Sequence, residues 1–99
     1  MANKEELFQF LDQHVFEPIL RANPDHYAEK DRSMLANVQQ KTKTERDRYQ
    51  HYPNAEKIRQ MYEDDLHSEN AKSVNEHLRH LKLPILADVK TEFLKRADQ

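Results

Sequence analysis

The sequence predicts an all-α protein, a small bundle of four to five helices with short loops. Glycine is absent from all 99 residues, whereas sheet proteins need glycine in tight hairpins and bulges. Four prolines divide the chain into segments, because proline breaks a helix interior but suits the first turn of a helix. Within the segments, apolar residues recur every three or four positions, as on one face of a helix. We expect residues 1–99 to form a single helical domain.

The first predicted helix covers residues 3–16. Asn3 is its predicted N-cap, and Glu6 completes a capping-box pattern three residues later. Pro18 is expected either to kink this helix or to begin a short turn. The inner face is apolar at helical spacing and consists of Leu7, Phe8, Leu11, Val15 and Ile19.

A loop at residues 23–25 separates the first helix from the second, which we expect Asp25 to cap and which runs to Tyr49 or Tyr52. From residue 39 to residue 50 this helix contains no apolar residue except Tyr49. A helix that is polar all round projects into solvent, bridges to a partner, or frays. The sequence therefore leaves open whether residues 39–52 are ordered without a partner.

Asn54 is the predicted N-cap of a third helix. After Leu66 a polar stretch follows, and the step of five to Ala71 shifts the apolar stripe. This shift favours two separate helices on either side of residues 67–70. A final amphipathic helix is expected from Ile85 onward, after Pro84, with basic residues near its C-terminus, where cations suit the helix dipole.

Composition excludes several classes of protein. The absence of cysteine rules out disulfide frameworks and thiolate metal sites. Without glycine, phosphate loops and dinucleotide-binding fingerprints are also excluded. No apolar run approaches the ~18 residues that a membrane span requires, and the sequence begins without a secretory signal pattern. We expect a cytoplasmic protein without a cofactor.

Oppositely charged segments follow one another along a chain whose net charge is -2. Residues 41–60 carry a net charge of +3, and residues 61–69 carry -4. This pattern indicates either solvated helices with local charge pairs or a docking surface for an acidic partner. Hydrophobic residues make up 36% of the chain, below the ~45% usual for globular proteins. A monomer of this composition should be only marginally stable, so a homodimer is expected.

Aromatic and basic residues gather around Pro53, and this turn is the leading candidate for a protein-binding surface. Tyrosine and arginine are enriched at the energetic centres of interfaces. The alternative is that the tyrosines simply pack across the turn with their hydroxyls in water. The candidate partner-binding residues are Arg46, Arg48, Tyr49, Tyr52, Lys57, Arg59 and Tyr62. The leading hypothesis is thus a non-catalytic interaction or regulatory protein.

Residues 73–81 provide a second hypothesis. They resemble the recognition helix of winged-helix repressors of the ArsR and MarR kind, with a small polar residue, a valine and a polar pair before His-Leu and a second leucine. This nine-residue resemblance implies a DNA-binding helix-turn-helix at residues 54–82. The sequence departs from that family at Glu76, on the reading helix, and in lacking a strand pair for a wing. The candidate nucleic-acid contacts are Lys72, Ser73, Asn75, His77, Arg79 and His80.

The histidines and carboxylates of the same region are the candidates for metal binding and for catalysis. His77 and His80 are three residues apart, as are Asp64 and His67, a spacing that occurs in di-iron helical bundles. These residues lie beside the apolar stripe rather than on it, so no metal site is predicted. The adjacent carboxylates of residues 63–65 splay around a helix and do not converge on a substrate, so no enzyme is predicted.

Overall fold

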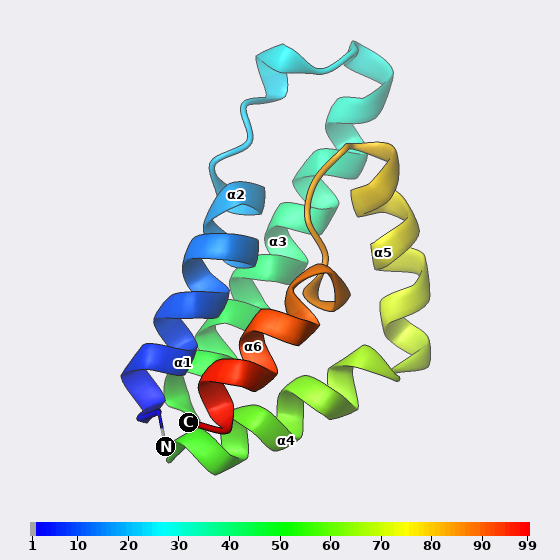
Figure 1. Cartoon of the computed structure of the whole chain (residues 1–99). Helices are drawn as coiled ribbons and strands as arrows, with labels where there is room; N and C mark the ends of the chain where they lie inside the picture. Colours follow the sequence, from blue (N-terminus) through cyan, green and yellow to red (C-terminus); the bar gives the residue numbers. More distant parts are fainter. Residues whose placement is uncertain (1) are drawn as a thin grey trace.

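The computed structural model describes residues 2–99 and shows an all-α fold. The helices are α1 (Lys4–Leu11), α2 (Glu17–Leu20), α3 (Glu29–His51), α4 (Ala55–Leu66), α5 (Glu69–His80) and α6 (Lys90–Ala97). A π-helix, Asp12–Phe16, joins α1 to α2 without a break, and 3₁₀ turns occupy Pro24–His26 and Leu86–Val89. Since α1 and α2 belong to one rod, the described residues form five helical rods, and the predicted bundle of four to five helices is confirmed (Figure 1).

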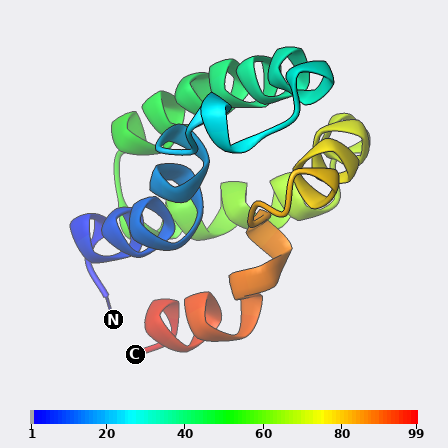
Figure 2. The ribbon, with the colours of Figure 1, turned by 90° about the horizontal axis from the view of Figure 1, so that it is seen from above.

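The rods surround one hydrophobic core. The rod of α1 and α2 runs beside α3, α4 crosses the end at which the termini lie, and α5 turns back along α3 (Figure 1). Seen from above, α3 and α6 lie on opposite sides, with α1 and α5 at the two ends (Figure 2). The molecule measures 44 × 24 × 22 Å along its principal axes. No described helix is both long enough and apolar enough to cross a membrane.

The first rod begins as predicted and accommodates Pro18 without a break. The side chain of Asn3 accepts a hydrogen bond of 2.9 Å from the backbone N–H of Glu6, which confirms the N-cap. Proline lacks an N–H, and its ring crowds the carbonyl four residues earlier. The π-helix widens the turn just before Pro18, where the N–H of Glu17 donates to the carbonyl of Asp12, five residues back. The widened turn thus explains why the chain stays helical to Leu20.

The start of α3 differs from the prediction. Asp25 does not cap this helix, because it lies in a 3₁₀ turn where its own N–H donates to the side chain of Asn23 at 2.9 Å. Tyr27 then extends the chain, and its hydroxyl donates to the carbonyl of Leu81 at 2.7 Å. This long-range bond holds the segment away from helical geometry, so α3 begins only at Glu29. Its end at His51 lies within the predicted range.

The polar second half of α3 packs against the rest of the fold along its inner face. Thr42 and Tyr49 are buried on its inner face. Gln39 donates side-chain hydrogen bonds to the carbonyls of Ile19 at 3.1 Å and Ala22 at 3.0 Å. These carbonyls lie at the end of α2, where the last carbonyls of a helix lack the usual partner four residues later. Gln39 therefore ties α3 to α2 through a polar contact that apolar spacing does not reveal.

The second half of the chain follows the predicted divisions closely. Asn54 caps α4 by accepting from the N–H of Lys57 at 2.8 Å, and the break between α4 and α5 falls at residues 67–68. The helix expected from Ile85 onward begins instead as a 3₁₀ turn and becomes α-helical only at Lys90. The carboxylate of Asp88 accepts from the N–H of Ile85 at 3.0 Å, which fixes this tighter first turn.

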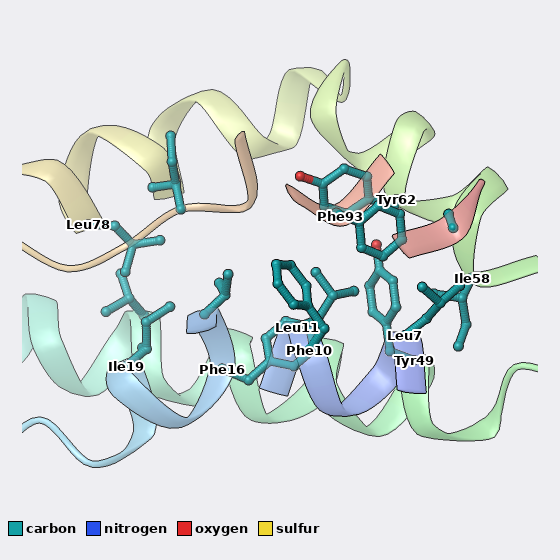
Figure 3. Packing of buried hydrophobic residues seen from close by; sticks show 14 of the residues in the cluster. Leu7, Phe10, Leu11, Phe16, Ile19, Tyr49, Ile58, Tyr62, Leu78 and Phe93 are labelled. Carbon is teal, nitrogen blue, oxygen red and sulfur yellow. The ribbon is translucent and has the colours of Figure 1, made fainter. Parts of the chain in front are cut away.

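Aromatic rings fill the centre of the core. Tyr62 and Phe93 stack with their ring centroids 4.1 Å apart (Figure 3). The ring centroids of Phe16 and Tyr49 lie 5.5 Å apart. Among residues 2–99, every Leu, Ile, Val, Met, Phe and Tyr side chain is buried or half-buried. The described surface therefore shows no large apolar side chain that would require a second copy to cover it. The homodimer stays a prediction.

Candidate functional site

A cavity of about 390 Å³ lies between α3 and α5. Its lining combines apolar and polar residues, and the exposed ones at its mouth include Lys41 and Arg48 of α3 and Asn70 of α5. The apolar walls come from the first rod, α5 and the chain that follows α5, and include Val15, Phe16, Ile19, Val74, Leu78 and Leu86. A volume of this size is typical of small-ligand pockets, which measure roughly 300–1,000 Å³.

Two carboxyl groups lie among these apolar walls, Glu45 from α3 and Asp65 from α4. Burial, followed by the charge of Asp65, raises the pKa of Glu45 to about 7 against the opposing effect of Arg48. Among residues 2–99, Glu45 forms no hydrogen bond or ion pair through its side chain. The cavity therefore holds a half-buried carboxyl that has no internal partner and is close to half-protonated at neutral pH.

Asp65, unlike Glu45, is held by a neighbour. The Tyr49 hydroxyl donates a hydrogen bond of 2.7 Å to Oδ2 of Asp65. Burial of Tyr49, followed by this bond to the carboxylate, raises the pKa of the phenol well above its usual range. Tyr49 thus acts as a donor that fixes the orientation of Asp65, and Asp65 presents a positioned acceptor at the cavity.

The residues that close the cavity are held by hydrogen bonds of their own. Tyr62 donates its hydroxyl hydrogen to the carbonyl of Leu86, and burial together with the nearby charge of Asp88 raises the pKa of this phenol to about 12. Asp88 in turn receives two hydrogen bonds from the guanidinium of Arg79, at 3.1 and 2.6 Å. The cavity wall after α5 is therefore anchored to both α4 and α5.

A second hollow, of about 430 Å³, lies between the end of α2 and the end of α5. Its polar residues, which include Arg21, His26 and Lys82, are all exposed. No buried polar group converges on it among the described residues that line it, so it is a weaker candidate than the cavity between α3 and α5.

The predicted surface around Pro53 requires correction. Tyr49 and Tyr62 are fully buried, each with an exposed fraction of 0%. Tyr49 packs against Phe16, and Tyr62 packs against Phe93. Both hydroxyls donate hydrogen bonds to internal acceptors, so neither tyrosine can anchor a partner on the surface. Both tyrosines are close to cations along the sequence, but their positions on α3 and α4 direct them inward.

Two of the predicted surface arginines are also engaged within the fold. Arg46 contacts Asp12 through both Nε, at 2.6 Å, and Nη2, at 3.0 Å, and ties α3 to the π-helix. Arg59 lies 2.6 Å from Asp98 at the C-terminal end of α6. The remaining members of the set are Arg48, at the mouth of the cavity, Tyr52, which is half-buried against Tyr49, and the half-buried Lys57.

The six candidate nucleic-acid contacts do not form one free basic face. Arg79 is paired with Asp88, and His80 lies 3.1 Å from Asp31. Lys72 lies 3.3 Å from Glu69. Ser73 is exposed on α5, whereas Asn75 lines the cavity. The sixth residue, His77, is half-buried, and its Nδ1 has no hydrogen-bond partner among the described residues. The cations here are thus partly neutralised by neighbouring carboxylates.

The histidines and carboxylates considered for a metal site stay apart. Within residues 2–99, no three His, Asp or Glu side chains are grouped so that they could hold a metal ion. His80 faces Asp31 on α3, and Asp65 accepts from Tyr49. The spacing of His77 and His80 therefore leads to separate environments and not to a shared one.

Glu45 is not among the residues predicted from the sequence, although the spacing of α3 contains a signal for it. Buried residues of α3 occur at Leu35, Val38, Thr42 and Tyr49. Glu45 lies three residues after Thr42 and four before Tyr49, which places it on the same helical stripe. A carboxyl on the inner face of a helix is unusual, because a buried charge without a partner is costly. That placement distinguishes Glu45 from the solvated charges around it.

No protein-family model, curated protein or solved structure matches this chain.

Proposed function

We propose that this chain is a small, non-catalytic binding protein that holds the apolar part of a ligand in the cavity between α3 and α5. The observation that carries the proposal is the combination of apolar walls with one unpaired carboxyl, Glu45, in a space of about 390 Å³. A largely apolar pocket with a few convergent polar groups is the usual composition of a small-ligand site.

The proposal moves the interaction site from the turn at Pro53 to this cavity, and Arg48 belongs to both. A ligand in the cavity contacts α3 on one side and α5 on the other, and so strengthens the packing between the two helices. A regulatory contact with a protein partner would then depend on whether the cavity is filled. A cytoplasmic location is part of the same proposal, and fractionation of the host cell tests it.

A non-catalytic role is favoured by the groups around the carboxyls. Glu45 has a pKa near neutrality, as a general acid or base requires. The described residues that line the cavity, however, include no histidine, and its hydroxyl groups belong to Thr42, Thr44 and Ser68. None of these hydroxyls donates to Glu45 or Asp65, so the pairing of a nucleophile with a base is absent among the described residues.

Titration with 1-octanol, followed by two-dimensional NMR of the ¹⁵N-labelled protein, tests the proposal. We expect the largest shift changes at backbone amides around Val74 and Leu78, which line the cavity. The variant Ala71→Phe places a ring in the cavity and should abolish these changes. Ala36→Phe makes the same replacement at an exposed position of α3 outside the cavity and should retain them.

The proposal is overturned if octanol leaves the amides of the cavity unchanged. It is equally overturned if Ala71→Phe, shown by circular dichroism to keep its helices, responds to octanol as the wild-type protein does.

A further inference from the structure

We propose that the ligand of this cavity is an amphiphilic cation, with its apolar chain against Val74 and Leu86 and its ammonium group at the carboxyls of Glu45 and Asp65. The inference rests on the proposed function and adds the chemical class of the ligand. The inference depends on the two carboxyls, Glu45 and Asp65, which line the cavity without an ion-pair partner among the described residues.

The carboxyls of the cavity form no close ion pair with the cations that also line it. Lys41 and Arg48 both line the cavity, yet neither lies within 4 Å of a carboxylate oxygen of Glu45 or Asp65. Elsewhere in the described chain, arginines such as Arg46 and Arg79 form close ion pairs with aspartates. Because Glu45 has no ion-pair partner among the described residues, its charge can be neutralised by a bound proton or by a cationic ligand.

The two carboxyls also keep acceptor positions that the described residues do not use. The Tyr49 hydroxyl occupies only Oδ2 of Asp65, and the carboxylate retains capacity for a further hydrogen bond. Glu45 has all of its acceptor sites unused by the described residues. An ammonium group has three donors and no acceptor, so it matches two carboxylates with vacant acceptor positions.

The apolar part of the ligand follows from the walls. Val15, Phe16 and Leu78 line the cavity but are at most 4% exposed, so the accessible apolar lining comes mainly from the half-buried Leu66, Val74 and Leu86. A small inorganic cation would leave this accessible lining in contact with water. An alkyl chain covers it, and each methylene group so buried should improve affinity roughly four-fold. The space is therefore suited to a cation with an apolar chain.

Binding should release a proton, because the ammonium takes the place of the proton on Glu45. The groups that set this titration are Glu45 itself, Asp65, Arg48, Lys41 and the Tyr49 hydroxyl. The proton on Glu45 competes with the ammonium below the pKa of about 7. Affinity should therefore rise as the pH increases from 6 to 8 and then level off.

Isothermal titration calorimetry with octylammonium, 1-octanol and octanoate at pH 8 separates the inference from the function on which it rests. We expect octylammonium to bind at least ten-fold more tightly than octanol, and octanoate more weakly than either. Butyl-, hexyl- and octylammonium should show a continuing gain in affinity with chain length. Titration of octylammonium at pH 6 in two buffers of different ionisation enthalpy should reveal the proton release.

Glu45→Gln keeps the shape of the side chain and removes its charge. It should lose the preference for octylammonium, with a drop in affinity of roughly ten-fold or more, and should keep its affinity for octanol. Glu63→Gln is the matched control, because Glu63 is exposed on α4 and lies outside the cavity. Octylammonium should bind this control as it binds the wild-type protein.

Each failure has its own signature. Octanol and octylammonium binding with equal affinity would overturn the inference and leave the cavity as an apolar site. An unchanged affinity of Glu45→Gln for octylammonium would do the same. An affinity that stops increasing with chain length at butylammonium would also overturn the inference. A chain as short as a lysine side chain would then be enough for full affinity. Absence of binding by all three octyl compounds would overturn the proposed function itself.

Discussion

The hydroxyl of Tyr49 lies 2.7 Å from Oδ2 of Asp65 and joins α3 to α4 at a residue that lines the cavity. Tyr49 is fully buried, and Asp65 is half-buried. A hydrogen bond between a neutral donor and a charged acceptor in such a place contributes more to stability than an exposed one, because water competes for it less.

Tyr49→Phe should lower the free energy of unfolding by about 1–2 kcal/mol, since the ring stays in the core while Asp65 loses its donor. Urea denaturation followed by circular dichroism measures the change. Tyr52→Phe is the control, because the half-buried Tyr52 donates no hydrogen bond from its hydroxyl to any described residue. Equal losses in the two variants would show that the bond to Asp65 contributes nothing of its own.

Glu45→Gln should stabilise the protein, and the gain should grow as the pH rises from about 4.5 to about 7. The carboxyl of Glu45 titrates near 4.5 in the unfolded chain, whereas burial and Asp65 raise its pKa to about 7 in the folded protein. Between these values the folded protein binds the proton more strongly, so the stability of the wild-type protein falls as the pH rises through this window. Above pH 7 the full cost of a buried charge is present, roughly 2 kcal/mol after allowance for solvent.

Urea denaturation of Glu45→Gln and of the wild-type protein at pH 4, 6 and 8 tests this expectation. The two proteins should be equally stable at pH 4, and the variant should be more stable by roughly 2 kcal/mol at pH 8. Glu63→Gln changes the same functional group on the surface and should follow the wild-type curve. A constant difference at all three pH values would contradict the raised pKa.

The arrangement of helices could be predicted because caps and apolar spacing are local signals. Asn3 and Asn54 cap helices where the sequence places them, and the shift of the stripe after Leu66 marks a real break. The start of α3 could not be predicted, because a bond from Tyr27 to Leu81, 54 residues away, decides it. Local patterns contain no information about such a distant acceptor.

The candidate site was harder to predict than the fold for a related reason. The sequence shows which residue types cluster, and it led to the tyrosines and arginines near Pro53. It does not show which of them form hydrogen bonds within the fold, as Tyr62 does with Leu86 and Arg46 does with Asp12. The cavity arises where residues from the first rod, α3, α4 and α5 meet, and only the three-dimensional packing brings Glu45 and Asp65 to the same space.

The pair of Arg46 and Asp12 should contribute to stability. Its two hydrogen bonds are partly shielded, since the side chain of Asp12 is only 13% exposed, and the guanidinium lies 5.4 Å from the centroid of the Phe8 ring. A double-mutant cycle with Arg46→Ala and Asp12→Ala should give a coupling energy of about 1–2 kcal/mol. Arg46→Lys keeps the positive charge but loses the planar guanidinium that forms two hydrogen bonds. This variant should therefore retain less than half of the coupling energy with Asp12.

The exposed pair of Arg21 and Glu17 is the control for this cycle. Its atoms lie 3.5 Å apart, and the Arg21 side chain is 78% exposed. Its coupling energy should be below about 0.5 kcal/mol. Similar coupling energies for the two pairs would show that Arg46 is an ordinary surface cation, available to a partner as the sequence first indicated.

Lys82 ends α5 in a backbone conformation that glycine would adopt more readily. Its φ of 59° is the one positive value among the described residues. The N–H of Leu83 donates to the carbonyl of Leu78 at 2.8 Å and that of Lys82 to Arg79 at 3.0 Å, the two bonds of a Schellman motif. The position that usually holds glycine in this motif is occupied here by a lysine, because the chain contains no glycine at all.

Lys82→Gly should therefore raise the free energy of unfolding by about 0.5–1 kcal/mol. The strain that a side chain suffers in the left-handed region, about 1–2 kcal/mol, is removed, and the greater freedom of glycine in the unfolded chain offsets part of the gain. Lys72→Gly makes the same replacement within α5, where the backbone is right-handed, and should cost about 1 kcal/mol. Urea denaturation of the two variants should show changes of opposite sign. A loss of stability in both would mean that the left-handed turn at Lys82 costs the fold nothing, and that contacts of the lysine side chain outweigh its backbone conformation.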